Sequence, residues 1–236
     1  MTASKALVSK AIGVLGGTFD PVHNGHIQIA LDALDILGLD EVRLMPCHLP
    51  PHRDRPTLTS KQRVELLRLA VKDYPQLMVD TCELSREQAS YTVTTLEHLR
   101  QEWGEDIGIV FIMGADAFAQ LHTWYQWERL RDLAHIVVMA RPNSPLPTHS
   151  VLQQWVEQAT LVGGDEQPVK NHGVFRQQSA GGVALLERHL MDVSATAIRA
   201  QLEQGLSPKT VESTLAGQLP RAVADYIQKL GLYRVR

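Results

Sequence analysis

The sequence predicts a doubly wound α/β fold, in which helices cover both faces of a parallel sheet. Two observations support this fold class. Short apolar runs alternate along the chain with segments whose apolar residues recur at helical spacing. Residues 107–113 and 135–140 are almost uninterrupted apolar runs, as expected of central parallel strands buried on both faces. A helical segment, residues 194–236, is expected to follow the sheet.

The first strand is expected at residues 11–15, and an amphipathic helix follows it. The apolar residues of this helix recur at helical spacing, at Ile27, Ala30, Leu31, Leu34 and Leu37. Gly38 is typical of a helix C-terminus, because glycine adopts the left-handed conformation easily. A second strand is expected at residues 42–45, where Pro46 ends it.

Two helix starts are expected in the middle of the chain. Thr59 and Gln62 have the spacing of a capping box, which predicts a helix running to about Lys72. A second helix is expected over residues 91–103, and Ser90 is positioned to cap it. The strands expected in this part of the chain are residues 77–80, 107–113 and 135–140.

Residues 141–182 differ in composition from the rest of the chain. They are rich in proline and glycine, and their apolar content is too low for a core of their own. We therefore expect an irregular excursion from the sheet, with a short helix at residues 151–158. A last strand is expected at residues 183–186, and Gly231 is expected to close the last helix. The whole chain, residues 1–236, is predicted to form a single domain.

Composition narrows the class of protein. The chain has 236 residues, of which 44% are hydrophobic, so it can bury a full core. The formal net charge is −3 and no block of lysine and arginine occurs, which argues against a nucleic-acid-binding surface. Cys47 and Cys82 form no CxxC pair and are typical of thiols in a reducing compartment. No signal peptide or membrane span is evident, so a cytoplasmic protein with no membrane partner is expected.

The run GGTFDPVHNGH, from Gly16 to His26, is the most informative stretch of the chain. It joins the first strand to the first helix, and backbone N–H groups and the positive end of the helix dipole at such a junction favour phosphate. Gly16 and Gly17 would let a phosphate approach the backbone closely. A tight turn without a ligand is the alternative. The dinucleotide pattern GxGxxG is absent, which argues against an oxidoreductase.

His23 and His26 allow three interpretations. A zinc pair would need further ligands at suitable spacing, and none follows nearby. A packed structural pair is the second alternative. A pair that faces phosphate fits best, because a helix beginning near Asn24 places His26 in its first turn. No metal site made by the protein itself is predicted.

Ser194 and Arg199 form a second candidate for binding phosphate. Ser194 stands at an expected helix N-cap, and Arg199 in the next turn offers a fork of donors. An ordinary capped helix is the alternative. Asp116, just after the strand at residues 107–113, could accept hydrogen bonds from ribose hydroxyls, or could simply favour a helix dipole.

Two further segments are candidates for contacting a ligand. Trp124 and Tyr125 lie in a stretch that is dense in aromatic residues for a chain with 6% aromatic residues, although aromatic side chains more often belong to a core. His52 and Arg53 follow two prolines in a stiff basic loop, which is either a solvated turn or a clamp on an anion.

These residues, taken in order, resemble a known family. Gly16–His26 together with Ser194–Arg199 resembles the HxGH superfamily of nucleotidyltransferases. The resemblance narrows to the bacterial nicotinate-nucleotide adenylyltransferases and runs from about Ile12 to Arg234. The motifs that narrow it are Pro50-Pro51-His52-Arg53, Ser90-Tyr91-Thr92, Gly114-Ala115-Asp116, Thr123-Trp124-Tyr125 and Arg141-Pro142.

The resemblance implies a Rossmann-like fold and a reaction. AMP would pass from ATP to nicotinate mononucleotide, which gives deamido-NAD and pyrophosphate by direct in-line attack in NAD biosynthesis. Mg²⁺ would accompany ATP and need no cage of protein ligands. Relatives that use nicotinamide mononucleotide, phosphopantetheine or CTP are alternatives, as is a nucleotide sensor without catalysis. Homo-oligomerisation stays open.

The resemblance also implies roles for single residues. The implied catalytic residues are His23, His26 and Arg199. The residues implied to bind ATP are Gly16, Gly17, Thr18, Phe19, Gly114, Asp116, Ser194 and Thr196. Those implied to bind nicotinate mononucleotide are Thr92, Trp124, Tyr125, His52, Arg53 and Arg141. The chain departs from the family at Ala195, where many members carry serine, and in residues 141–182, which are longer than in compact members.

Overall fold

A computed structural model of the 236-residue chain describes residues 8–48, 55–86, 90–141, 144, 147–159, 161–163, 174–204 and 215–233. Its centre is a sheet of seven strands in the order β3-β2-β1-β4-β5-β7-β6, and every neighbouring pair is parallel. The strands are β1 (Lys10–Gly17), β2 (Glu41–Pro46), β3 (Leu77–Val79), β4 (Ile107–Gly114), β5 (His135–Ala140), β6 (Leu161–Gly163) and β7 (Val183–Glu187). The strand order reverses between β1 and β4, so the predicted doubly wound fold is confirmed.

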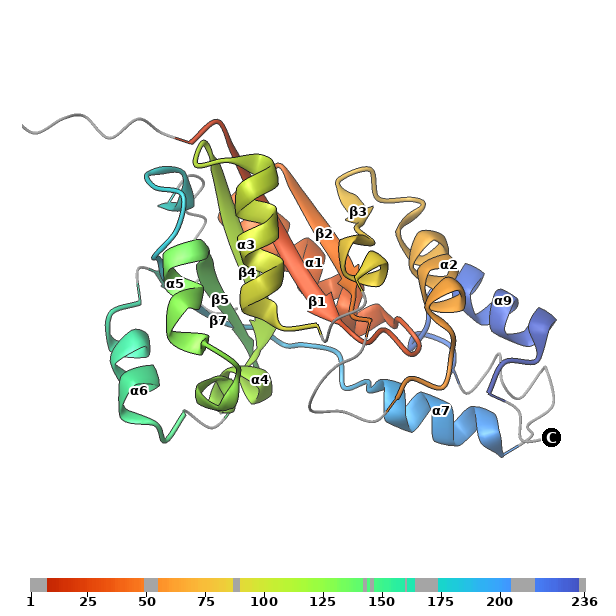
Figure 1. Ribbon diagram of the computed structural model, residues 1–236. Helices are drawn as coiled ribbons and strands as arrows, with labels where there is room; N and C mark the ends of the chain where they lie inside the picture. Colours follow the sequence, from red (N-terminus) through yellow and green to blue (C-terminus); the bar gives the residue numbers. More distant parts are fainter. Residues whose placement is uncertain are drawn as a thin grey trace, which may run out of the picture.

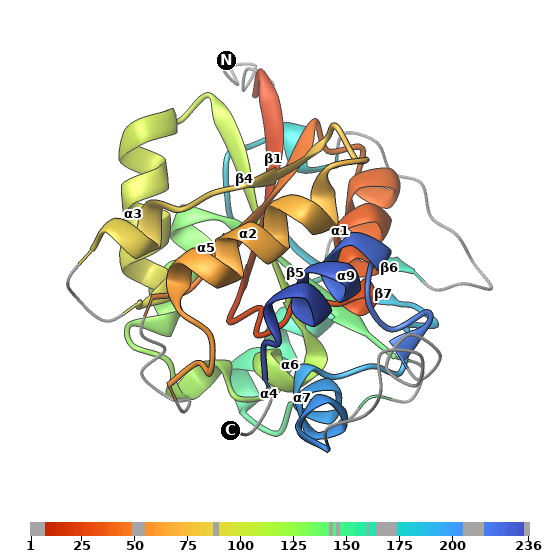
Figure 2. The same cartoon turned by 90° about the vertical axis from the view of Figure 1, so that its right-hand side faces the viewer.

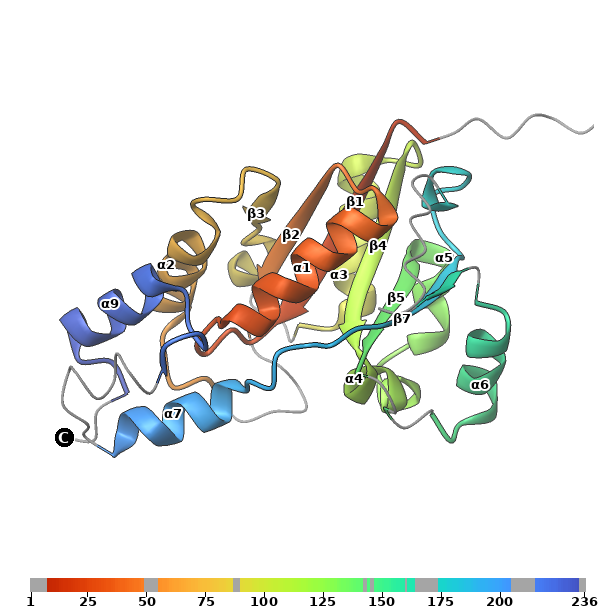
Figure 3. The same ribbon diagram turned by 180° about the vertical axis from the view of Figure 1, so that it is seen from behind.

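Helices cover both faces of this sheet (Figures 1 and 3). The first face carries α1 (Asn24–Leu37), α2 (Ser60–Val71) and α9 (Arg221–Leu230). The opposite face carries α3 (Thr92–Trp103), α4 (Ala115–Ala119), α5 (Leu130–Leu133) and α6 (Ser150–Glu157). The helix α7 (Ala195–Glu203) lies beyond the carboxyl end of β1, close to the start of α1. The short 3-10 helices are η1 (Cys82–Ser85), η2 (Leu121–Thr123), η3 (Trp127–Arg129) and η4 (Val174–Arg176).

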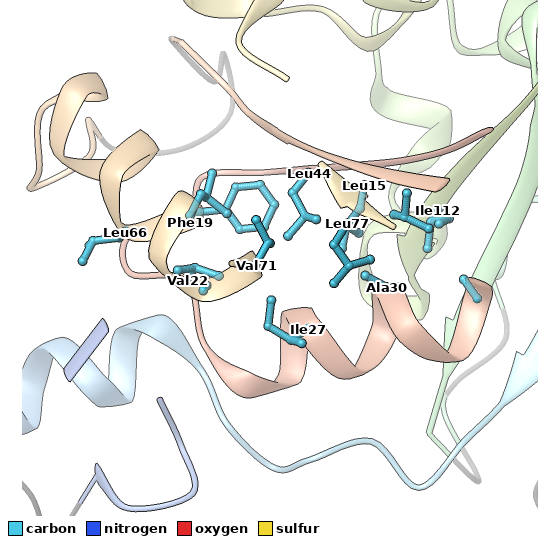
Figure 4. Close-up of a cluster of buried hydrophobic side chains, with 14 of the residues drawn as sticks. Leu15, Phe19, Val22, Ile27, Ala30, Leu44, Leu66, Val71, Leu77 and Ile112 are labelled. Atoms are coloured by element: carbon cyan, nitrogen blue, oxygen red, sulfur yellow. The ribbon is translucent and has the colours of Figure 1, made fainter. Parts of the chain in front are cut away.

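The core has two halves because successive side chains of a strand point to opposite faces. In β4, Val110 and Ile112 pack with the helices of the first face, whereas Ile109 and Phe111 pack with those of the second. Figure 4 shows the first half, in which Ile27 of α1 lies with side chains of β1, β2 and α2. Burial on both faces explains why the central strands are apolar throughout.

The local signals for helix ends are confirmed. Gly38 closes α1 with φ 63° and ψ 43°, and Gly231 closes α9 with φ 59° and ψ 35°. At the start of α2, Thr59 N–H donates to Gln62 Oε1 at 3.0 Å and Gln62 N–H donates to Thr59 Oγ1 at 3.3 Å. These ends were predictable because each depends on residues within one helical turn.

Two expectations were wrong. Ser90 does not cap α3, since its Oγ accepts a hydrogen bond from the His48 N–H at 3.0 Å and Tyr91 is the N-cap residue. Residues 141–182 are not wholly an excursion from the sheet, because Leu161–Gly163 form the edge strand β6. The strand is short and lies in a part of the chain that is rich in proline and glycine, and this composition concealed it.

His135 is a fully buried histidine at the start of β5. Its Nδ1 accepts a hydrogen bond from the Gly182 N–H at 2.9 Å, so the proton lies on Nε2, which contacts the Gln178 carbonyl at 2.8 Å. A Cβ at Gly182 would lie 2.7 Å from this Nδ1, so the contact needs glycine. Burial lowers the pKa of His135 to about 4.

This lowered pKa predicts a loss of stability in acid. The unfolded chain takes up a proton near pH 6.5 and the folded chain only near pH 4, so the contribution of His135 is complete above pH 6.5 and is lost as the pH falls from 6.5 to 4. Between pH 7 and pH 5 we expect His135 alone to account for a loss of about 2 kcal/mol. Urea unfolding at both pH values checks this. His135→Asn keeps an acceptor but cannot titrate, so an equally steep loss in that variant would contradict the prediction.

Among the residues described above, no helix is both long enough and apolar enough to cross a membrane.

Candidate active site

A cavity of about 470 Å³ opens at the carboxyl ends of β1 and β4, where the strand order reverses. Ligands bind at this place in open parallel sheets. Seven of the residues predicted from the sequence line the cavity together, and these are Gly16, Gly17, Thr18, Thr92, Asp116, Trp124 and Tyr125. Segments that are far apart in the sequence therefore contribute to one site.

The turn between β1 and α1 forms one side of this site. Phe19 has a left-handed backbone with φ 50°, and its buried ring packs edge-on to the His26 ring with centroids 4.9 Å apart. A Cβ at Gly17 would lie 3.0 Å from the Phe19 ring, so this ring leaves no space for a side chain there. Since the Phe19 side chain is buried, only its backbone is left for the predicted contact with ATP.

His23 and His26 stack at the start of α1, with ring centroids 3.7 Å apart and an angle of 24° between their planes. The His23 backbone N–H donates to His26 Nδ1 at 3.2 Å. This bond makes Nδ1 an acceptor, so neutral His26 carries its proton on Nε2. His23 is 7% exposed, and burial lowers its pKa to about 4, which keeps it neutral at pH 7. Its buried Nδ1 has no hydrogen-bond partner among the described residues.

The start of α7 lies beside the start of α1. Arg199 Nη1 donates to the backbone oxygen of Asp20 at 2.7 Å, and its Nη2 donates to Thr196 Oγ1 at 3.2 Å. Ser194 is the N-cap residue, as predicted, and its Oγ accepts from the Ala197 N–H at 3.2 Å. A Cβ at Gly25 would lie 2.9 Å from Val193, which shows how closely the two helix starts approach. Two N-termini with partial positive charge thus meet at one place.

The N-terminus of α3 forms the opposite side of the cavity. Ser90, Tyr91 and Thr92 line the cavity, and no described side chain caps the first turn of the helix. The Tyr91 ring lies 4.8 Å from the Tyr125 ring, and the Trp124 ring lies edge-on to Phe111 at 6.5 Å. Backbone N–H groups beside flat aromatic faces suit a planar ring that carries negative charge.

Comparisons with known proteins agree with this geometry. The cytidylyltransferase-like family model matches residues 14–201. A protein of Cellvibrio japonicus named "Probable nicotinate-nucleotide adenylyltransferase" is 39% identical over 223 residues, which cover 94% of this chain and 98% of the relative. One of Marinobacter nauticus with the same name is 40% identical and covers 94% and 96%. The chain belongs to the nicotinate-nucleotide adenylyltransferase family.

A solved structure shares the fold of this chain. It is a nicotinic acid mononucleotide adenylyltransferase of Plasmodium falciparum in complex with NaAD, with a TM-score of 0.68 and 15% identity. The match covers 95% of this chain and 97% of the other. At this identity the likeness concerns the fold.

Eight predicted site residues that the structure describes are not among those that line the cavity, and these are Phe19, His23, His26, Gly114, Arg141, Ser194, Thr196 and Arg199. Arg141 forms an ion pair with Asp192 at 3.2 Å and donates to the Met191 carbonyl at 3.2 Å. Gly114 is the N-cap residue of α4, and a Cβ there would meet nothing within 4 Å. His52 and Arg53 lie outside the described residues.

Sequence reasoning missed a buried arginine that is hydrogen-bonded to two residues of the cavity wall. Arg63 of α2 is 1% exposed and donates to the backbone oxygens of Thr18 and Cys47, each at 2.8 Å. Arg63 lies in the apolar stripe of α2, one turn before Leu67, and this position could have indicated that its side chain is buried. Cys47, Glu83 and Thr95 also line the cavity, and no motif marked them.

Proposed function

We propose that the chain transfers AMP from ATP to nicotinate mononucleotide, forming deamido-NAD and pyrophosphate in NAD biosynthesis. The observation that carries this proposal is that one cavity is lined both by the glycine turn of β1 and by the N-terminus of α3. The first end suits phosphates and the second suits an anionic ring. Membership in the adenylyltransferase family supports the same reaction.

In the proposed reaction, a phosphate oxygen of the mononucleotide attacks the α-phosphorus of ATP in line. A new P–O bond forms, the bond from the α-phosphorus to the oxygen bridging to the β-phosphorus breaks, and pyrophosphate leaves with that electron pair. In such transfers the protein acts mainly by positioning the two substrates and by neutralising the negative charge of their phosphates. No covalent intermediate with the protein is needed.

The groups near the start of α1 would hold ATP. The backbone of Gly16 and Gly17 would admit the phosphates closely, and Thr18 would add its hydroxyl. His26 offers its Nε2–H to the charge that builds at the α-phosphorus, because Nδ1 is already occupied. His23 would bind beside it. Ser194, Thr196 and Arg199 would bind the β- and γ-phosphates at the start of α7.

The groups around α3 would hold the acceptor. The pyridine ring would stack on Trp124, and its carboxylate would accept hydrogen bonds from N–H groups around Thr92 and Tyr125. On the ATP side, Asp116 together with Gly114 would contact a ribose. Arg141, His52 and Arg53 are proposed to bind a substrate phosphate, and Arg141 would first have to leave Asp192.

ATP would enter as its magnesium complex, with the ion held by phosphate oxygens and water. No group of three or more His, Cys, Asp or Glu side chains in the described part of the chain is placed to hold a metal ion, and the proposal assigns the ion no protein ligand. The proposal places the whole reaction in one domain, residues 1–236.

An assay with ATP and either nicotinate or nicotinamide mononucleotide tests the proposal. We expect kcat/KM to be roughly 10- to 100-fold higher for the acid, because a charged acceptor gains about 1.5–3 kcal/mol from each hydrogen bond at the helix start. Equal kcat/KM values for the acid and the amide would contradict the predicted preference for the acid. Binding of ATP without any turnover would favour the nucleotide sensor instead.

A further inference from the structure

Asp20 lies in the turn between β1 and α1 and is hydrogen-bonded to three distant parts of the chain. Its carboxylate is buried, with 3% of the residue exposed. Oδ2 accepts from the Thr57 N–H at 2.6 Å, and Oδ1 accepts from the Tyr233 hydroxyl at 2.7 Å. Its backbone oxygen accepts from Arg199 at 2.7 Å. The same residue thus contacts the start of α7, the segment before α2 and the end of the described chain.

The turn that holds Asp20 needs such restraint. Phe19 has φ 50°, a backbone conformation that a bulky residue keeps only where its surroundings enforce it. His23 follows Asp20 by three residues and begins α1, so a shift of this turn would move the stacked histidines. It would also move the oxygen that holds Arg199.

Tyr233 provides part of this restraint from 213 positions away. It is itself buried and follows α9, which packs on α2 (Figure 2). The helix α2 carries Arg63, which donates to the Thr18 oxygen. The packed helices α2 and α9 thus hold the turn at Thr18 through Arg63 and at Asp20 through Tyr233, which follows α9. Burial and the Asp20 carboxylate raise the pKa of Tyr233 above its ordinary value, so its hydroxyl stays a donor.

We propose that Tyr233 is a positioning residue for adenylyl transfer, acting through Asp20 on the histidine pair and Arg199. This inference rests on the proposed function. Tyr233 contacts the turn through Asp20, so its effect falls on the alignment of the histidine pair and Arg199, the groups proposed to bind the phosphates. A residue that follows α9 thereby helps to position the proposed catalytic groups.

Tyr233→Phe tests the proposal, because it removes the hydroxyl and keeps the ring. We expect kcat to fall roughly 10- to 100-fold, as misplacement of about 1 Å does, while KM for both substrates changes less than about twofold. Tyr226→Phe is the matched control, since Tyr226 is a half-buried tyrosine of α9 whose hydroxyl has no hydrogen bond to the described residues. Circular dichroism must show both variants folded at the assay temperature. A Tyr233→Phe variant with kcat within about twofold of the unaltered chain overturns the proposal.

Variants of Asp20 separate positioning from charge. In Asp20→Asn, the side-chain oxygen can still accept from Thr57 and the amide NH₂ can donate to the Tyr233 oxygen, so we expect kcat within about threefold of normal. Asp20→Ala loses both contacts and should lose at least as much kcat as Tyr233→Phe. If Asp20→Asn lost as much kcat as Asp20→Ala, the carboxylate charge would be the cause and positioning by hydrogen bonds would be wrong.

Nuclear magnetic resonance of the histidine rings gives a readout that needs no turnover. The ring ¹⁵N and ¹H signals of His23 and His26 should shift in Tyr233→Phe and stay in place in Tyr226→Phe. Absence of adenylyl transfer in the unaltered chain would refute the proposed function, whereas unshifted histidine signals in Tyr233→Phe would refute the positioning role alone.

Discussion

His26→Ala is expected to lower kcat at least roughly 10²- to 10³-fold, the cost of removing one well-placed donor to charge in a transition state. The reason is the tautomer. His26 Nδ1 accepts from the His23 N–H at 3.2 Å, so the proton of the neutral ring lies on Nε2, which is the proposed donor to the α-phosphate. Since Arg199 and the α7 start remain in place, ATP binding should survive at least partly. Steady-state kinetics with ATP and nicotinate mononucleotide, and calorimetry with ATP alone, measure the two effects.

Two further substitutions separate the functions of the two ring nitrogens. His26→Asn keeps an acceptor where Nδ1 stands and removes the distal donor, so its stability should stay near normal while kcat falls as in His26→Ala. His98→Ala is the matched control, because His98 is an exposed histidine of α3 paired with Glu102. Near-normal turnover in His26→Asn would contradict the role assigned to Nε2–H.

Arg63→Met is expected to lower the free energy of unfolding by about 2–4 kcal/mol, because it removes a buried guanidinium that donates to two part-buried backbone oxygens. These oxygens belong to Thr18 and Cys47, at the ends of β1 and β2. The variant should also raise KM for ATP, since the turn that Arg63 holds is the proposed phosphate cradle. Urea unfolding and steady-state kinetics measure these changes.

Arg68→Met is the matched control for Arg63→Met. Arg68 is an exposed arginine of the same helix and has no hydrogen bond or ion pair within the described part of the chain. We expect a change within about 0.5 kcal/mol, as for most surface substitutions. If the two variants lost the same stability, loss of helix propensity or of general packing would explain Arg63→Met, and its hydrogen bonds would not.

Most of the sheet could be read from the sequence because its signals are strong and local. Continuous apolar runs marked β4 and β5, and a capping box marked the start of α2. Short or ambiguous signals failed. The short edge strand β6 lies in a stretch rich in proline and glycine, and Ser90 stood at a position typical of a cap but is hydrogen-bonded to the His48 N–H instead. A serine hydroxyl binds whichever partner the tertiary structure brings near, and its own sequence context does not decide which.

The sequence by itself determined the class of chemistry, through the Gly16–His26 run and the helix start at Ser194. These motifs act through backbone N–H groups and side chains within one turn, so their geometry follows from neighbouring residues. Only the tertiary structure decided what holds that geometry. Arg63 supports the turn from a helix and Tyr233 binds Asp20 from the far end of the chain. Such contacts depend on how distant segments pack, and no periodic pattern in the sequence indicates which distant residues will meet.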